Sequence, residues 1–455
     1  MSVFPKLTSV DAHSSATRPL ASAVLGGGTP RKALLALLFA PLLFGFLSYA
    51  ISAALGMTTL GNPLATSAAL IRRLMIPNER SDSWEPMIQA LALLHGAHGG
   101  SLYDILFFQR HEKFQYAPTS LVWLEGIKYF APLTPAGLNR INAVAFIVNS
   151  ISGAFLIRVC TRDKWSIAAE ENRNFLTVVA LLLPFVYWPT VYGFTVGQIQ
   201  VWINLLATLA VLFWCLDRKI GCGIALGLAC TIKPQLGLFL LWGLVWREWR
   251  LTAAMAATAA LFGLISVLMY GLANHLGFIE VLAYIARHGE SFRANQSVNG
   301  LLNRLLFVGN NTDWDGANFA PYNPIVRWGT LLSGLVLMVI PLALSRADGG
   351  RRASAFDLCF AIVCFTMASP VAWEHHYGLA LPAYILALGR FASVTGVPRR
   401  IAVGLAMSWL LVGSNLQITN VFSGTYFNPV QSYVFIGGVI LLLCLTGIRR
   451  SAMTA

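Results

Sequence analysis

The sequence has few charged residues. Asp, Glu, Lys and Arg make up 11% of its 455 residues, less than half of the roughly 25% that is usual in soluble proteins. Hydrophobic residues reach 56% and gather in runs such as "RKALLALLFAPLLFGFLSYAISAAL" and "SYVFIGGVILLLCLTGIRR". These runs have the roughly 17–25 residues that a transmembrane helix needs. The composition therefore excludes a soluble protein and predicts an all-α protein that crosses the membrane many times.

Cysteine is absent from the segments that we expect outside the membrane, and acidic residues are in the minority. The seven cysteines all fall in or beside apolar runs: Cys160, Cys215, Cys222, Cys230, Cys359, Cys364 and Cys444. This distribution argues against a disulfide framework and against a Cys-based zinc site. The net charge of +13 fits basic residues beside helix ends on the cytoplasmic side better than nucleic-acid binding.

The first apolar run has no small-residue cleavage pattern straight after it, so we expect a retained helix rather than a signal peptide. Basic residues before this run predict a cytoplasmic tail at 1–32, matched by a second tail at 449–455. The transmembrane domain is then 33–448. It is expected to contain about twelve segments if an apolar hairpin counts as two: about 33–55, 136–158, 175–193, 197–216, 220–246 (the hairpin), 252–272, 325–345, 355–368, 377–391, 401–416 and 432–448.

Two long segments are predicted on the outer side, at 56–134 and 273–324. The first contains "SWEPMIQALALLHG" and "YAPTSLVWLEGIKYF", which are typical of amphipathic helices at the membrane surface. On this topology the polar interruptions of the apolar runs all belong to the outer half. Because ionisable groups at membrane depth face a cavity or one another, we expect an outward-facing polar site.

Asp82, in "ERSDSWEP", begins one of these amphipathic stretches. It has the residue type of a helix N-cap, but also of a general base that removes a proton from an attacking hydroxyl. Glu85 follows three residues later on the same helical face and is a possible second carboxylate.

Tyr116 and Gln198 are further polar candidates. Tyr116, in "FQYAPTSLVW", suits an aromatic anchor at the membrane interface as well as a contact to substrate. Gln198, in "GFTVGQIQVWIN", can satisfy backbone groups at a helix end or hold a ligand that is rich in hydroxyls.

Lys233 interrupts the apolar hairpin in "TIKPQ". A lysine there costs about 2.5–3.5 kcal/mol on insertion, unless it reaches water from a shallow tip. Because an ammonium is a good point-charge partner for phosphate, we favour a phosphate contact.

The remaining candidates lie late in the chain. Gln296 and Arg304, in "ANQSVNGLLNRLL", could hold sugar hydroxyls and a phosphate, although polar loops are common. In "SPVAWEHHYG", the adjacent His375 and His376 point to different sides of a helix and do not form the i, i+4 pair of a helical zinc site. We therefore expect an imidazole that binds phosphate or sugar, or a polar helix cap, and no metal.

The order of these pieces resembles glycosyltransferase family 87, the polyprenyl-phosphate-mannose-dependent branch of the GT-C superfamily. The resemblance covers roughly residues 75–390 and rests on Asp82, "GSLYD", "YAP", "GQIQ", "CTIKP", "NQS" and "SPVAWEHH". The chain departs from the family pattern at Ala117, where the family has proline, and at Gln200, where it has asparagine.

The resemblance implies a GT-C fold and an enzyme of the bacterial cytoplasmic membrane with its active site on the outer side. A sugar, with mannose favoured, would pass from a polyprenyl-phosphate donor to a hydroxyl of a lipid or glycan acceptor. The reaction would be inverting, with Asp82 as general base and without cofactor or metal. Lys233, His375, His376 and Arg304 would bind the donor phosphate, whereas Glu85, Tyr116, Gln198, Gln296 and Trp373 would contact sugar or acceptor.

Two other functions share the many spans and the intramembrane polar groups. A secondary transporter or lipid flippase has no evident need for a carboxylate in a long amphipathic outer segment. A polymerase or ligase of surface polysaccharide commonly has its large outer segment late in the chain, whereas here the larger one is early.

Overall fold

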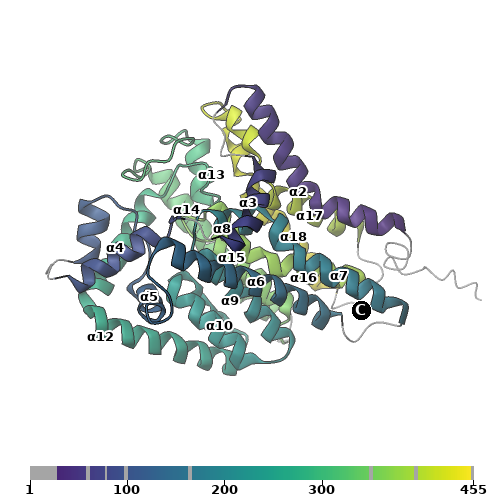
Figure 1. Ribbon diagram of the computed structural model, residues 1–455, viewed down its shortest axis with the longest axis horizontal. Coiled ribbons are helices and arrows are strands. Elements are labelled where there is room, and N and C mark those ends of the chain that lie inside the picture. Colours follow the sequence, from purple (N-terminus) through teal and green to yellow (C-terminus); the bar gives the residue numbers. More distant parts are fainter. Residues whose placement is uncertain are drawn as a thin grey trace, which may run out of the picture.

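The protein is described by a computed structural model that covers residues 28–57, 62–76, 79–96, 101–161, 167–347, 352–393 and 398–451. Helices form nearly all the regular structure of these residues (Figure 1). Backbone pairing of the β type is limited, in this part of the chain, to one antiparallel bridge between Asn295 and Trp373. The expected all-α architecture is therefore confirmed.

Five described helices are long and apolar enough to cross a membrane: α2 (Gly28–Ala54), α6 (Pro135–Cys160), α12 (Trp249–His288), α14 (Pro324–Ala347) and α18 (Tyr433–Ser451), the last with the preceding turn η6 (Asn428–Ser432). A sixth span results if α7 (Ile167–Val186) and α8 (Trp188–Thr195), which are bent by 51°, are taken together. The apolar helices that are shorter are α9 (Gln200–Cys215), α10 (Lys219–Ile232), α11 (Leu238–Val245) and α15 (Ala355–Met367). The number of twelve segments stays a prediction.

The apolar block around Lys233 forms a hairpin of two short helices, as the sequence predicts. In α10, Gly223 lies against Leu251 and Gly227 lies against Thr258, so α10 runs parallel to the start of α12. In α11, Gly243 lies against Thr252, so α11 brings the chain back to the start of α12, beside which α10 also begins. Pro234 lacks an amide hydrogen and begins the turn η3 (Pro234–Gly237) directly after Lys233. Lys233 is therefore at the tip of the hairpin.

The predicted tails stay predictions, and the helices differ in extent from some of the expected spans. Helix α2 begins at Gly28, before the predicted start of its span at 33, and residues 1–27 lie outside the described part. Helix α18 continues to Ser451, and Arg449 is buried in it and pairs with Asp357. The span predicted at 252–272 ends close to a kink at Gly271, where φ is +76°, and a second helical stretch continues from there to His288. The span predicted to start at 377 is preceded by a 3-10 turn, η4 (Glu374–Ala380), and α16 (Leu381–Ser393) follows.

The first long outer segment contains helices at both places where amphipathic stretches were expected. Its elements are α3 (Pro63–Met75), α4 (Trp84–His95), η1 (Asp104–Gln109), η2 (Pro118–Ser120) and α5 (Leu121–Ile127). In α4, Trp84 and Met87 are buried whereas Glu85 is exposed, which is the amphipathic pattern. Helix α3 lies between α2 and α8 (Figure 1).

Lys113 joins the two long outer segments. Its ammonium pairs with the Glu290 carboxylate at 2.7 Å and donates to the backbone carbonyl of Asp315 at 2.9 Å. The same nitrogen lies 4.2 Å from the ring centroid of Trp314 and 4.3 Å from that of Phe319. These contacts fix 101–134 against 289–323, next to the short helix α13 (Val298–Leu305). The remaining described elements are α17 (Arg399–Gly413) and η5 (Gln417–Phe422).

Candidate active site

Asp82 is positioned by a turn that belongs to a distant part of the chain. The backbone amide of Asp82 donates to the carbonyl of Val196 at 3.1 Å, and that of Ser83 donates to the carbonyl of Gly197 at 3.3 Å. Gly197 has a φ of +78°, and a Cβ there would lie 2.2 Å from the carbonyl oxygen of Arg80. Only glycine allows this approach, so Gly197 explains how the two loops come together.

The side chain of Gln198 holds the Asp82 carboxylate. Its amide nitrogen donates to Asp82, while its carbonyl oxygen accepts from the hydroxyl of Ser83 at 2.7 Å and from that of Tyr116 at 3.3 Å. The two hydroxyls thus fix the orientation of the amide, because its oxygen must face them and its nitrogen must face the carboxylate. Gln198 and Tyr116, both predicted from the sequence, belong to one network with Asp82.

Asp82 is not the cap of α4. The helix begins at Trp84 and its N-cap position is Ser83, so the capping alternative for Asp82 is wrong. The Asp82 side chain is accessible to solvent, yet protein surrounds its carboxylate on most sides. This burial raises the pKa of Asp82, and the hydrogen bond from Gln198 offsets part of the rise. An accessible carboxylate with a raised pKa has the properties of a general base.

Glu85 does not join this network among the described residues. It is exposed on α4 and accepts a hydrogen bond at 3.1 Å from Gln89, one turn further along the same helix.

Lys233 is held by the same turn that holds Asp82. Its ammonium donates to the side-chain oxygen of Gln200 at 2.6 Å, and the nitrogen of Gln200 donates to Asn204 at 2.9 Å. Gln198 and Gln200 are two residues apart, so their Cα atoms are separated by about 7 Å at most. Residues of one short turn, Gly197–Gln200, therefore bind both the Asp82 carboxylate and the Lys233 ammonium.

The first outer segment also contacts the hairpin directly. Thr119 donates to the backbone carbonyl of Thr231 at 2.6 Å, and the indole of Trp123 donates to the Thr231 hydroxyl at 2.9 Å. Residues of the "YAPTSLVW" stretch thus position the hairpin tip as well as contributing Tyr116 to the Asp82 network.

His375 and His376 lie in η4, close enough to Lys233 for its charge to act on both. Burial lowers the pKa of each imidazole well below its ordinary value, and the charge of Lys233 lowers it further. Both rings are consequently neutral at pH 7. Nδ1 of His376 accepts from the backbone amide of Trp373 at 3.2 Å, which leaves Nε2 as the hydrogen-bond donor. The buried Nδ1 of His375 has no hydrogen-bond partner among the described residues.

Glu374 has partners that compensate its burial. It accepts from the indole nitrogen of Trp188 at 3.0 Å and pairs with Arg293 at 3.8 Å. Both charged side chains are buried. The acidic residue of "AWEHH" therefore stabilises the fold of η4 against α8, and the two histidines remain as the groups that can act on a ligand.

Tyr192 connects the Asp82 region to η4 and was missed in the sequence. Its ring stacks on Trp188 with centroids 5.3 Å apart and lies 6.0 Å from His375. Its hydroxyl interacts electrostatically with both Asp82 and Glu374. Gly193 allows η4 to approach α8, since a Cβ there would come within 3.3 Å of Cβ of His375. The sequence places Tyr192 in an ordinary apolar run, so nothing in it pointed to a site.

Arg304 and Gln296 form a second network, in which each side-chain nitrogen and oxygen of the two residues has a partner. Arg304 is buried, and its guanidinium donates to Ser432 at 2.9 Å and to the carbonyls of Asn295 at 2.8 Å and Arg293 at 3.4 Å. Gln296 is buried as well, and both ends of its amide are bonded to backbone groups. The donors of Arg304 are occupied within the protein, so the structure does not bring it together with Lys233 as a phosphate ligand.

Trp373 lies between the two networks. It pairs with Asn295 through the backbone bridge, and its ring packs edge-on against Trp314 with centroids 5.2 Å apart. Its side chain is half-buried, which leaves part of the ring available to a ligand.

Across the described ranges, no group of three or more His, Cys, Asp or Glu side chains is arranged to hold a metal ion. The polar groups of the site are thus a carboxylate, an ammonium, two neutral imidazoles and several amides and hydroxyls.

Comparison with known proteins assigns the chain to a family. No curated protein matches the chain significantly. The model of glycosyltransferase family 87 matches residues 114–370, more than half of the chain. The matched range contains Tyr116, the Gly197–Gln200 turn and Lys233, whereas Asp82 precedes it and His375 and His376 follow it. The chain therefore belongs to glycosyltransferase family 87, a membrane family of the GT-C type.

Proposed function

We propose that this membrane glycosyltransferase moves a sugar, with mannose favoured, from a polyprenyl-phosphate donor to a hydroxyl of a lipid or glycan acceptor. The observation that carries the proposal is the Gly197–Gln200 turn, whose two glutamines bind the Asp82 carboxylate and the Lys233 ammonium. A base and a cation on one turn match the two needs of the reaction, since the acceptor must lose a proton and the leaving phosphate gains negative charge.

Asp82 is the general base of this proposal. It removes the proton from the acceptor hydroxyl, whose oxygen attacks the anomeric carbon. The bond from this carbon to the phosphate oxygen breaks, and polyprenyl phosphate leaves with the electron pair. A single displacement of this kind inverts the anomeric centre and needs no covalent intermediate.

Lys233 and the two histidines are the proposed contacts of the donor phosphate. The Lys233 ammonium offsets the negative charge that develops on the leaving phosphate. Neutral imidazoles donate or accept single hydrogen bonds, and the partnerless Nδ1 of buried His375 is a group that a bound substrate would satisfy. Because each guanidinium nitrogen of Arg304 already has a partner within the protein, we do not assign it to the phosphate.

Trp373, Tyr116 and Gln198 are the proposed contacts of sugar and acceptor. Gln198 and Tyr116 border Asp82, where the acceptor hydroxyl must lie for its proton to be transferred. Trp373 lies beside His376, to which its backbone amide donates, and its half-buried ring offers an apolar face to a sugar. Gln296 acts by supporting η4 rather than by direct contact.

The expected location is the bacterial cytoplasmic membrane, with the site on the outer side. This placement follows from the basic residues at the other ends of the helices and from the twelve-segment topology, in which the outer segments 56–134 and 273–324 cover the site. The GT-C fold with amphipathic helices in the first outer segment is part of the same proposal.

The decisive test is Asp82→Asn in purified full-length protein supplied with polyprenyl-phosphate mannose and an envelope lipid extract as acceptor. Loss of a general base should lower transfer by roughly 10²- to 10⁴-fold, measured as labelled mannose in the product. Glu85→Gln is the matched control, because it removes an exposed carboxylate from the same helix start and should leave transfer nearly unchanged. Full transfer by Asp82→Asn, or passage of substrate across the membrane without a new glycoconjugate, would contradict the proposal.

A further inference from the structure

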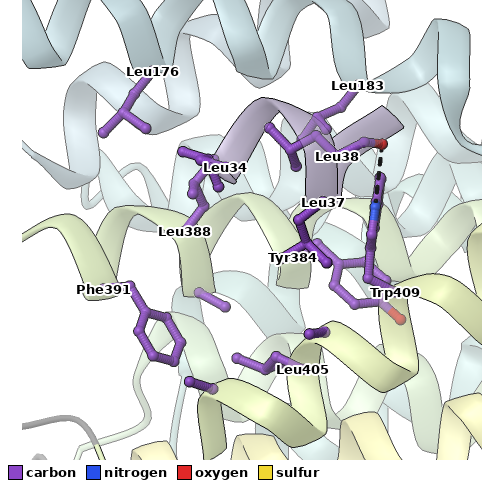
Figure 2. A pocket seen from close by; sticks show the side chains of 13 residues that line it. Leu34, Leu37, Leu38, Leu176, Leu183, Tyr384, Leu388, Phe391, Leu405 and Trp409 are labelled. Atoms are coloured by element: carbon purple, nitrogen blue, oxygen red, sulfur yellow. Dashed lines mark hydrogen bonds between the residues drawn. The ribbon is translucent and has the colours of Figure 1, made fainter. Parts of the chain in front are cut away.

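An apolar cavity of about 220 Å³ lies between α2, α7, α16 and α17 (Figure 2), and none of the residues of the candidate active site lines it. Its walls are almost entirely hydrocarbon, with side chains such as Leu34, Leu176, Leu388 and Leu405. Its lining residues on α7 and on α17 extend over eight residues each, from Leu176 to Leu183 and from Ala402 to Trp409. The seven steps from the first to the last of these residues correspond to about 10 Å along a helix, so the cavity is a slot along the helices.

One end of the slot is closed by aromatic rings. Tyr384 and Trp409 meet there edge-to-face with centroids 5.1 Å apart, and Figure 2 shows both rings beside Leu38. Their polar atoms are used within the protein, because the Tyr384 hydroxyl bonds Ser408 at 2.7 Å and the Trp409 indole donates to the carbonyl of Leu38 at 3.3 Å. The closed end therefore also offers an apolar surface to an occupant.

The opposite end of the slot is basic. Three of the four helices carry basic residues next to their lining residues at this end: Arg31 and Lys32 before Leu34, Arg173 before Leu176, and Arg399 and Arg400 before Ala402. Arg390 of α16 instead lines a different pocket, beside Cys160. Lys32, Arg399 and Arg400 are exposed. Arg31 is oriented at this end by a 2.8 Å hydrogen bond to Asn172. Glu170 and Glu171 on α7 are acidic, but the basic residues remain in the majority.

We propose that this slot binds one acyl chain of an anionic phospholipid of the cytoplasmic leaflet, with the lipid phosphate at the basic end. Hydrocarbon in the slot removes the unfilled space between four helices, and basic pockets between transmembrane helices on the cytoplasmic side bind anionic head groups. The majority of positive charge favours an anionic phospholipid over a zwitterionic one. The positive-inside rule assigns the basic end to the cytoplasmic leaflet.

This site is distinct from the site of the sugar donor. Helix α7 lines the slot through Leu176 and Leu183, and the chain then continues past the bend into α8, where Tyr192 borders Asp82 and His375. The slot thus lies along α7, and the groups of the candidate active site lie beyond the bend, at α8. The lipid in the slot is a bound structural partner that is not consumed by the reaction.

The test uses full-length protein reconstituted in nanodiscs that contain equal amounts of phosphatidylglycerol and phosphatidylcholine. After transfer to detergent, native mass spectrometry identifies the lipid that stays bound. We expect wild-type protein to retain one phosphatidylglycerol. Ala406→Phe and Ala402→Phe, which fill the slot at two levels, should lose it, whereas Ala256→Phe on the exposed face of α12 should not.

The charge of the basic end is tested separately. Arg399→Gln with Arg400→Gln should remove the preference for phosphatidylglycerol over phosphatidylcholine, whereas Arg247→Gln with Arg250→Gln, two exposed arginines near α12, should keep it. Equal retention of both lipids by wild type, or unchanged retention by both slot-filling variants, overturns the proposal. The proposal is also overturned if phosphatidylglycerol is retained only after residues 2–27 have been deleted, because the N-terminal segment would then fill the slot in the full-length protein.

Discussion

The network around Arg304 and the network around Asp82 are near neighbours that differ in how completely they are hydrogen-bonded. The guanidinium of Arg304 and the amide of Gln296 have all their main partners inside the protein. In contrast, Asp82 is accessible to solvent, and His375 has a buried nitrogen without a partner among the described residues. Native proteins rarely leave such groups incomplete without a reason. The difference separates a network that stabilises the fold from one that has room for a ligand.

The comparison is tested most strongly by one substitution in each network. Lys233→Met should lower sugar transfer by roughly 10²- to 10³-fold, because the leaving phosphate loses its cation, with little change in melting temperature. Arg304→Met should cost about 3 kcal/mol or more of stability, since it leaves several buried acceptors unsatisfied. Thermal unfolding in detergent and transfer per folded molecule are measured for both. The reverse pattern, a stable inactive Arg304→Met and an unfolded Lys233→Met, would exchange the two assignments.

A smaller effect is expected for the histidines. His375→Ala and His376→Ala should each slow transfer by about 10- to 100-fold, which corresponds to one hydrogen bond to a charged group, without unfolding the protein. The readout is kcat for transfer, with circular dichroism as the check on folding. Full activity of both variants would show that the pair only forms the start of η4.

The smallest effect concerns pH. The base must be ionised, and burial raises the pKa of Asp82, so kcat/KM should fall on acidification at a higher pH than an ordinary aspartate would give. Gln198→Leu removes the hydrogen bond that lowers this pKa, so the fall should move to still higher pH. Glu85→Gln should leave the profile in place. A shift to lower pH in Gln198→Leu would contradict the role of Asp82 as base.

The long helices could be predicted from the sequence because their hydrophobic runs exceed the length of a membrane span. The hairpin with Lys233 at its tip could also be predicted from the sequence, since a proline follows the lysine and basic residues flank both ends of the apolar block. The helical stretch from Gly271 to His288 was not predicted, because it begins directly at the kink at Gly271 and has no loop before it. The burial of Arg449 was missed because its partner, Asp357, is distant in the sequence.

The site residues were predictable only as a set of polar side chains. Asp82, Tyr116 and Gln198 do meet, yet their meeting depends on the close approach of Gly197 to Arg80, which no periodicity reveals. Arg304 and Lys233 were both predicted from the sequence as cations for the donor phosphate, and only their hydrogen-bond partners distinguish them. The partner of Lys233 comes from more than thirty positions away, and one of the Arg304 partners, Ser432, from more than a hundred.

The contact between Lys113 and Glu290 has a consequence for the salt tolerance of the protein. Both side chains are buried, and two aromatic rings cover the ammonium. Mobile ions screen exposed charges far more than buried pairs, so a change in salt concentration should hardly weaken the ion pair between Lys113 and Glu290. The segments 101–134 and 289–323 should therefore stay joined over a wide range of ionic strength.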